Sequence, residues 1–169
     1  MFVVAALVAA ACGSSSKAVR PLTSTTSEVR TVVQAAAYNV DLSTFATALN
    51  IAGTVDRLSR PGPFTVFAPN NEAFSKLSNR RLTALLSTAR KRELGKILTY
   101  HVVAGRHLSK NLEPGRLKTL NGAFLTITRR GNVIELRDAH GNRAKIVRAD
   151  IVTPNGVINI IDHVLLPPG

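Results

Sequence analysis

Four histidines, at positions 101, 107, 140 and 163, are the side chains of this sequence with the widest range of chemistry. None of them forms a His-x-x-x-His pair, and His101 and His107 are separated by a Gly-containing bend rather than by helical turns. The sequence has no Gly-x-Ser-x-Gly nucleophile motif and no phosphate-binding glycine loop. Its acidic residues are scattered, so the sequence pairs no two of them as acid and base. These patterns predict no catalytic residues, no metal site and no cofactor.

The only cysteine, Cys12, excludes a disulfide within the chain. It follows the apolar residues 1–11 and precedes Gly-Ser-Ser-Ser. Such a segment spans about 16 Å as a helix, whereas a bilayer core is about 30 Å thick, so residues 1–12 are predicted to be an export signal rather than a transmembrane span. Ala9-Ala10-Ala11-Cys12 resembles a bacterial lipoprotein processing site, at which Cys12 would receive the lipid. The alternative is an Ala-x-Ala cleavage site that releases a free protein.

The chain is strongly basic, with 22 Lys and Arg against 10 Asp and Glu. Much of the excess lies between Arg80 and Lys118, which indicates affinity for an acidic polymer or an anionic lipid. The alternative is a basic surface that only keeps the protein soluble. Nucleic acid is not expected, because no aromatic residues are interleaved with the cations and the chain carries an export signal. The residues that we assign to polyanion contact are Arg80, Arg81, Arg90, Lys91, Arg92 and Lys96.

The first half of the chain has mostly helical patterns. Residues 13–26 are rich in Ser and Thr and predict a flexible tether, so the folded domain is expected to be residues 27–169. A first helix is predicted from Ser27 to near Tyr38-Asn39. Asp41 is expected to cap a second helix that stops at Gly53, and a short helical turn follows at residues 55–58. Residues 79–99 have a further helical pattern.

The extended patterns lie around residue 65 and beyond residue 115. Residues 64–68 form an apolar strand that Pro69 ends, and Asn70 is expected to cap the helix that follows. Beyond Gly115 apolar residues alternate with polar ones, and Asn155-Gly156 predicts a hairpin. The last strand, residues 157–166, is apolar on both faces and is predicted to be central. Helices followed by antiparallel strands indicate an α+β fold.

Three of these segments together resemble the fasciclin-like domain family. Residues 65–77 are similar to its first signature box, residues 97–105 to the Tyr-His segment between the boxes, and residues 155–168 to its second box. The resemblance implies a wedge of two β-sheets with N-terminal and flanking helices. It also implies a non-catalytic role in adhesion or protein interaction outside the cell. The single-domain exported format is similar to secreted and lipid-anchored proteins of mycobacteria and related bacteria.

The same resemblance draws attention to Tyr100 and His101, because in animal members this dipeptide has been associated with integrin binding. The interpretation that we favour is structural: a histidine among Leu98, Val102 and Val103 is expected to be buried and to need hydrogen-bond partners. Asn71 and Asp162, the polar residues of the two boxes, are the partners that we predict for His101. Partner binding by Tyr100 and His101 is the alternative.

The sequence thus predicts an exported and lipid-anchored adhesion or protein-interaction module. Its expected partner is an extracellular or cell-surface protein, and its expected location is secreted or on the outer face of the cell membrane, in the envelope. The alternative function is an envelope protein that binds polyanions or lipid through its basic surface. An enzyme is a third and less favoured class.

Overall fold

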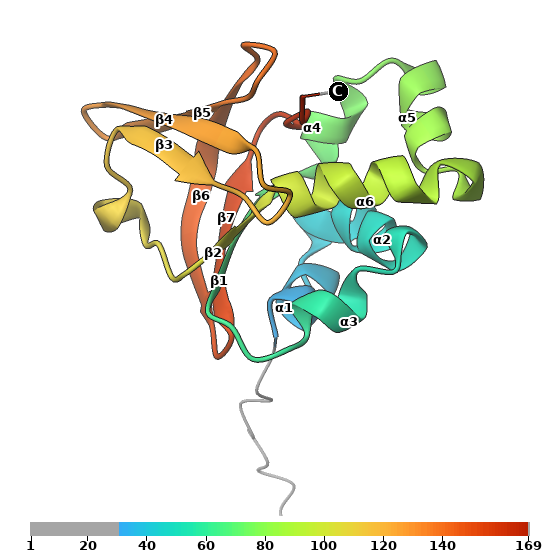
Figure 1. The fold of residues 1–169 in the computed structure, drawn as a ribbon, viewed down its shortest axis with the longest axis horizontal. Coiled ribbons are helices and arrows are strands. Elements are labelled where there is room, and N and C mark those ends of the chain that lie inside the picture. The colour runs from blue at the N-terminus through green and yellow to red at the C-terminus, as the bar shows by residue number, and fades with distance from the viewer. Residues whose placement is uncertain (1–30, 169) are drawn as a thin grey trace, which may run out of the picture.

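Two apolar strands far apart in the sequence, β1 (Phe64–Pro69) and β7 (Gly156–Ile161), lie side by side at the centre of the fold (Figure 1). The computed structural model describes residues 31–168, so the predicted export signal, tether and lipidated Cys12 lie outside the described residues. The two strands pair in parallel, with Val66 opposite Ile158 and Ala68 opposite Ile160. All of β7 is buried, which confirms the prediction of a central last strand, but the strand ends at Ile161 rather than at Leu166 as predicted.

Seven strands form one sheet in the order β2-β1-β7-β6-β5-β4-β3. A bridge between Val103 and Thr119 brings its two ends together, so the sheet is nearly closed. The predicted wedge is present, and its two sheets are continuous through β6 (Arg143–Thr153), which bends at register shifts around Arg148 and has Asp150 at φ 60°. The remaining strands are β2 (Val102–Ala104), β3 (Gly115–Lys118), β4 (Phe124–Arg130) and β5 (Val133–Arg137).

The helices pack together against one face of β1 and β7 (Figure 1). The predicted turn at residues 55–58 and the predicted Gly53 stop, with Gly53 at φ 66°, are both confirmed. The helices are α1 (Val32–Ala37), α2 (Ser43–Ala52), α3 (Val55–Leu58), α4 (Asn71–Ser75), α5 (Asn79–Leu85) and α6 (Lys91–Tyr100), with 3₁₀ turns η1 (Val40–Leu42), η2 (Thr88–Arg90) and η3 (Ser109–Asn111).

Three predicted helical spans differ from the structure. The predicted first helix does not run through Thr31, which has extended backbone angles and caps α1 reciprocally with the Gln34 side chain, so α1 begins at Val32; residues 27–30 lie outside the described residues. Asp41 lies within η1 and does not cap α2. The helical pattern of residues 79–99 is broken between α5 and α6, where Ser87 has extended backbone angles.

Two hydrophobic clusters lie on opposite faces of β1 and β7. Val66 and Ile158 belong to the cluster shared with the helices, whereas Phe67 and Ile161 point into the cluster enclosed by the sheet. The second cluster is completed by apolar residues of β4 and β5, such as Leu125 and Leu136. Within residues 31–168, no helix is both long enough and apolar enough to cross a bilayer.

Candidate functional site

The Tyr-His dipeptide lies where α6 ends and β2 begins, as the sequence predicted. Tyr100 and His101 are both fully buried. The backbone carbonyl of His101 accepts a hydrogen bond from Phe67 N–H at 2.8 Å, so β1 contacts this junction directly. Tyr100 also packs in one cluster with Phe67, Ile161 and Leu165. The two signature boxes and the segment between them therefore meet in the interior of the domain.

The imidazole of His101 connects two backbone segments. Its Nδ1 lies 2.8 Å from the Ile97 carbonyl oxygen, and its Nε2 lies 3.0 Å from the backbone nitrogen of Leu165. A carbonyl can only accept and an N–H can only donate, so the ring is neutral with its proton on Nδ1. Burial lowers the pKa of His101 from 6.5 to about 4, against the smaller opposing effects of the Ile97 carbonyl and the Asp138 charge.

Tyr100 connects the end of α6 to β4 and to the turn after β5. Its hydroxyl donates to the Phe124 carbonyl at 3.0 Å and accepts a hydrogen bond from Ala139 N–H at 3.2 Å. Burial raises the pKa of Tyr100; the Ala139 hydrogen bond lowers it and the Asp138 charge raises it further. The phenol therefore stays protonated and holds the start of β4 against the turn after β5.

The structure does not bring Asn71, His101 and Asp162 into one network, so the predicted partners of His101 were wrong. Asn71 instead joins α4 to α2, because its side-chain oxygen accepts from Thr44 N–H and its amide donates to the Val40 carbonyl. These distances are 3.0 and 2.8 Å. The imidazole of His101 lies beside backbone groups, which supply both of its hydrogen bonds and leave no vacant ring nitrogen for either side chain.

Asp162 organises the end of β7. Its carboxylate accepts from Lys145 N–H at 2.7 Å and from the His163 ring at 2.9 Å. Burial would raise the pKa of Asp162, but the hydrogen bonds from His163 and Lys145, together with the charges of His163 and Lys76, lower it below its usual value. Asp162 is therefore a carboxylate that positions β6 and β7 relative to each other.

Asn155 is a structural residue whose role the sequence did not reveal, because the Asn-Gly pair by itself indicates only a hairpin turn. The predicted hairpin is confirmed, with β6 ending at Thr153 and β7 beginning at Gly156. The buried Asn155 side chain accepts from Val32 N–H at 2.8 Å and donates to the Leu58 carbonyl at 2.8 Å. A Cβ on Gly156 would lie 2.2 Å from the Phe64 carbonyl oxygen, so only glycine allows β1 to approach this closely.

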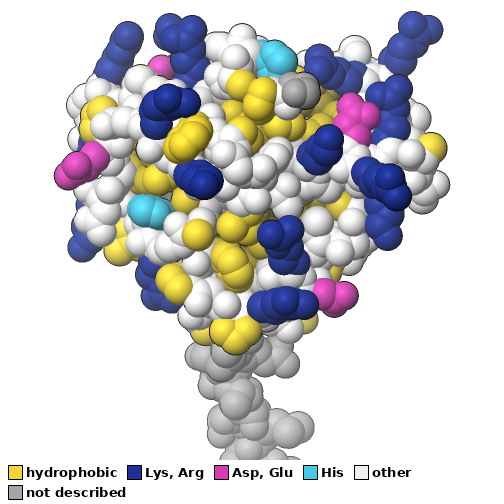
Figure 2. Space-filling view, viewed as in Figure 1, with side chains coloured by type: hydrophobic (Ala, Val, Ile, Leu, Met, Phe, Trp, Pro, Cys, Tyr) yellow, Lys and Arg dark blue, Asp and Glu magenta, His cyan; other side chains and the backbone are white. Residues whose placement is uncertain are grey.

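The six basic residues assigned to polyanion contact lie on neighbouring elements α5, η2 and α6, and all six are exposed. Arg90 is in an ion pair with Glu93 at 3.1 Å, so its charge is partly compensated. Figure 2 shows Lys and Arg side chains spread over the visible face of the molecule, with few acidic side chains among them. The residues are Arg80, Arg81, Arg90, Lys91, Arg92 and Lys96.

The candidate site therefore has two parts with different properties. The interior junction around Tyr100 and His101 is engaged in hydrogen bonds of the fold, whereas the basic side chains are open to solvent. In the part of the chain that the structure describes, no three His, Cys, Asp or Glu residues are grouped as a metal ion would require.

Comparisons with known proteins agree with this geometry. The profile of the fasciclin domain matches residues 40–167. The chain is 40% identical over 143 residues to Protein sll1483 of Synechocystis sp., covering 85% of this chain and 77% of that protein. It is 39% identical over 142 residues to the immunogenic protein MPB70 of Mycobacterium bovis, covering 81% of this chain and 69% of that protein.

Among solved structures, the fold is similar to a domain pair of the insect cell adhesion molecule fasciclin I. The TM-score is 0.72 with 18% sequence identity, and the match covers 80% of this chain and 50% of the insect chain. At this identity the likeness concerns the fold.

Proposed function

The chain belongs to the fasciclin domain family, and from that premise we propose that it is an exported, non-catalytic module for adhesion or protein interaction at the cell surface. Domains of this family are adhesion or matrix-interaction modules, as in the insect cell adhesion molecule. The observation that carries the proposal is the family match over residues 40–167, which spans both central strands and the Tyr100–His101 junction.

The roles of the buried polar residues support a non-catalytic function. A general base needs access to its substrate and a pKa near the working pH. His101 is fully buried, both of its nitrogens are occupied, and its pKa is about 4. Asp162 is occupied by Lys145 N–H and His163. In this proposal these residues stabilise the fold, and the alternative of direct partner binding by Tyr100 and His101 would require the junction to open.

A pull-down from cell-surface and host-matrix fractions tests the proposal. We expect the purified protein to retain a saturable protein partner at physiological salt, and a His101→Gln variant to retain the same partner under conditions where it stays folded. Turnover of a small-molecule substrate with no protein partner would contradict the proposal. Loss of the partner by a fully folded His101 variant would instead support the binding role of the dipeptide.

The mode of attachment is a second part of the proposal. Cys12 follows Ala9-Ala10-Ala11 and is the only cysteine of the chain, which supports lipidation after export. Metabolic labelling with a lipid precursor is expected to label the wild-type protein and not a Cys12→Ser variant. A wild-type protein that is released from cells without label would show cleavage at the Ala-x-Ala site instead.

The second candidate function is polyanion or lipid binding through the six exposed cations of α5, η2 and α6. The observation that favours it is their exposure on adjacent elements, with Glu93 as the acidic partner of one of them. Binding through such a surface weakens steeply as salt rises, because exposed charges are screened over about 8–10 Å at physiological ionic strength. A partner that stays bound at high salt favours the adhesion module, and binding that disappears with salt favours the polyanion surface.

A further inference from the structure

Strands β3, β4 and β5 and the start of β6 form the second half of the sheet. Three arginines and one threonine lie in one row across the outer face of these four strands. Strand pairing places Arg116 of β3 opposite Thr126 of β4, Thr126 opposite Arg137 of β5, and Arg137 opposite Arg143 of β6. The neighbouring residues Leu125 and Leu136 point the other way and are fully buried, so this row faces outward. With strands about 4.8 Å apart, the row spans about 14 Å. We call it the arginine row.

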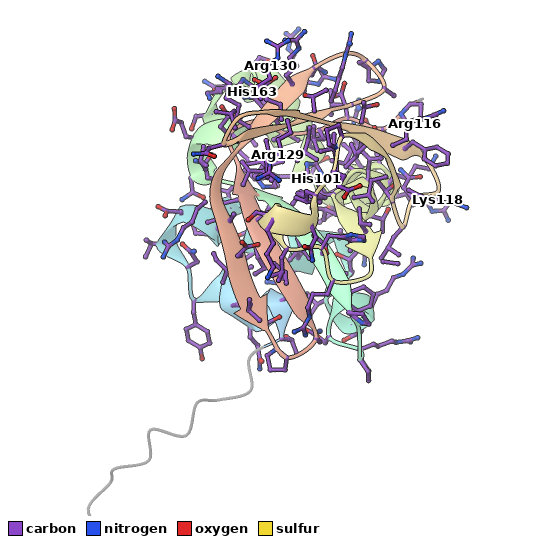
Figure 3. All side chains as sticks on the ribbon, turned by 90° about the vertical axis from the view of Figure 1, so that its left-hand side faces the viewer. His101, Arg116, Lys118, Arg129, Arg130 and His163 are labelled. Atoms are coloured by element: carbon purple, nitrogen blue, oxygen red, sulfur yellow. The ribbon has the colours of Figure 1, made fainter. Side chains whose placement is uncertain are left out.

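The surroundings of the arginine row are also basic. Lys118, Arg130 and Lys145 lie on the same outward face, and Glu135, opposite Lys145, is the carboxylate among them. In Figure 3, Arg116 and Lys118 lie at one end of this part of the sheet and Arg130 at the other. Within residues 31–168, no ion pair involves Arg116, Arg137 or Arg143. Arg137 and Arg143 are directly opposite each other, an arrangement that costs stability in a sheet.

The row borders a surface cavity of about 640 Å³. Its lining includes Arg116, Phe124, Thr126 and Arg137, and the guanidinium of Arg116 lies 4.5 Å from the centre of the Phe124 ring. This cation–π contact favours a guanidinium position over the Phe124 ring, at the wall of the cavity. Asp138 also lines the cavity, but it is 6% exposed and accepts from the backbone N–H groups of His140, Asn142 and Leu166 and from the Asn142 side-chain amide.

We propose that the arginine row and its cavity bind an acidic segment of a partner protein. Guanidinium groups match carboxylates in a two-pronged geometry, and among residues 31–168 neither Arg137 nor Arg143 is in an ion pair. In an extended peptide, alternate side chains point to the same side, so Asp or Glu at every second position can face the row. The inference rests on the proposed function, because it specifies the chemistry of the protein partner.

The position of the arginine row fits a protein that is held at its N-terminal end. The described chain begins beside α1, and β3, β4 and β5 lie at the opposite end of the molecule (Figure 1). A partner can therefore approach this face while the N-terminal end is held elsewhere. The arginine row lies on other elements than the six cations of α5, η2 and α6. The two basic surfaces can therefore be tested independently.

Binding of a fluorescent peptide that alternates Glu and Ala tests the inference. We expect the double variant Arg116→Gln/Arg137→Gln to bind it about tenfold or more weakly than wild type, which corresponds to about 1.4 kcal/mol or more. The matched control is Arg57→Gln/Arg60→Gln, which removes the same charge from exposed positions at and after α3, and is expected to change the affinity less than about twofold. A peptide with Gln in place of Glu should not bind.

Three results would overturn the inference: an equal loss in both double variants, no loss in either, or tighter wild-type binding to an acidic polysaccharide or anionic vesicle than to the peptide. The melting temperature of each variant shows that it is folded. The pull-down separates this inference from the proposed function. If the double variant keeps the surface-protein partner, the adhesion function stands and the arginine row is not its site.

Discussion

The two halves of the sheet differ in what lies on their outer faces. Strands β1 and β7 are covered on both sides, by the helices and by the cluster enclosed by the sheet. Strands β3, β4 and β5 bury one side, and their other side carries Arg116, Lys118 and Arg137. The Tyr100 and His101 side chains lie between these halves and bond to both.

Because of this difference, we expect substitutions in the two halves to have different effects. Strands β1 and β7 contribute buried side chains to both hydrophobic clusters, so substitutions there are expected to change stability. The half with an open face tolerates charged side chains there, and its substitutions are expected to change binding.

The largest effect is expected for Phe67→Ala compared with Phe124→Ala. Phe67 is fully buried in the enclosed cluster, so its truncation should lower the free energy of unfolding by about 3–5 kcal/mol. Phe124 is 43% exposed and stacks with Arg116, so the same change should cost about 1 kcal/mol or less. Urea denaturation measures both. Equal losses would remove the distinction between the halves.

The pH dependence of stability tests the His101 junction. Its pKa is about 4 in the folded state against 6.5 ordinarily, so protonation favours the unfolded chain, and the stabilisation present above pH 6.5 is lost as pH falls toward 4. Between pH 7.5 and 5 the loss should be about 2 kcal/mol. Urea denaturation of His101→Gln should lack this slope. The contribution of Asp162, whose pKa is lowered, is lost only at more acidic pH, below its usual value of 3.8.

A smaller effect is expected for Tyr100→Phe, which keeps the ring and removes the hydroxyl. The change leaves the Phe124 carbonyl and the Ala139 N–H without their partner and should lower the free energy of unfolding by about 1–2 kcal/mol. Amide hydrogen exchange should quicken at Ala139 more than in β1. Unchanged stability would show that the hydroxyl does not join the halves.

The smallest effect is expected for Arg143→Gln in the arginine row. Arg143 is exposed and lies directly opposite Arg137, so removing one of two like charges should leave stability unchanged or raise it by about 0.5 kcal/mol. The melting temperature at low and high salt measures this. A clear loss of stability would mean that the row supports the fold rather than a ligand.

Much of the fold was predictable from local patterns. Asn70 caps α4 as predicted, accepting from Ala73 N–H at 2.7 Å, and the alternating pattern predicted beyond Gly115 is present in β4, where Leu125 and Ile127 are buried. The apolar character of residues 157–166 on both faces likewise predicted a central strand, which β7 is, although it ends at Ile161. Each of these features depends on residues that are close together in the sequence, so local sequence patterns are enough to predict it.

Features that depend on distant pairing were not predictable. The parallel pairing of β1 with β7 and the bridge between Val103 and Thr119 join residues far apart in the chain. The same reason explains the errors around His101, whose partners are backbone groups of Ile97 and Leu165 rather than the polar side chains expected. The arginine row was missed because Arg116, Arg137 and Arg143 become neighbours only through strand register.

The most direct test of the division between the halves is an amide NMR titration of the protein with the acidic peptide. We predict that the largest shifts occur at Arg116, Thr126, Arg137 and Arg143, with little change in β1 and β7. The largest shifts on α5 and α6, or in the strands around Tyr100 and His101, would contradict the account.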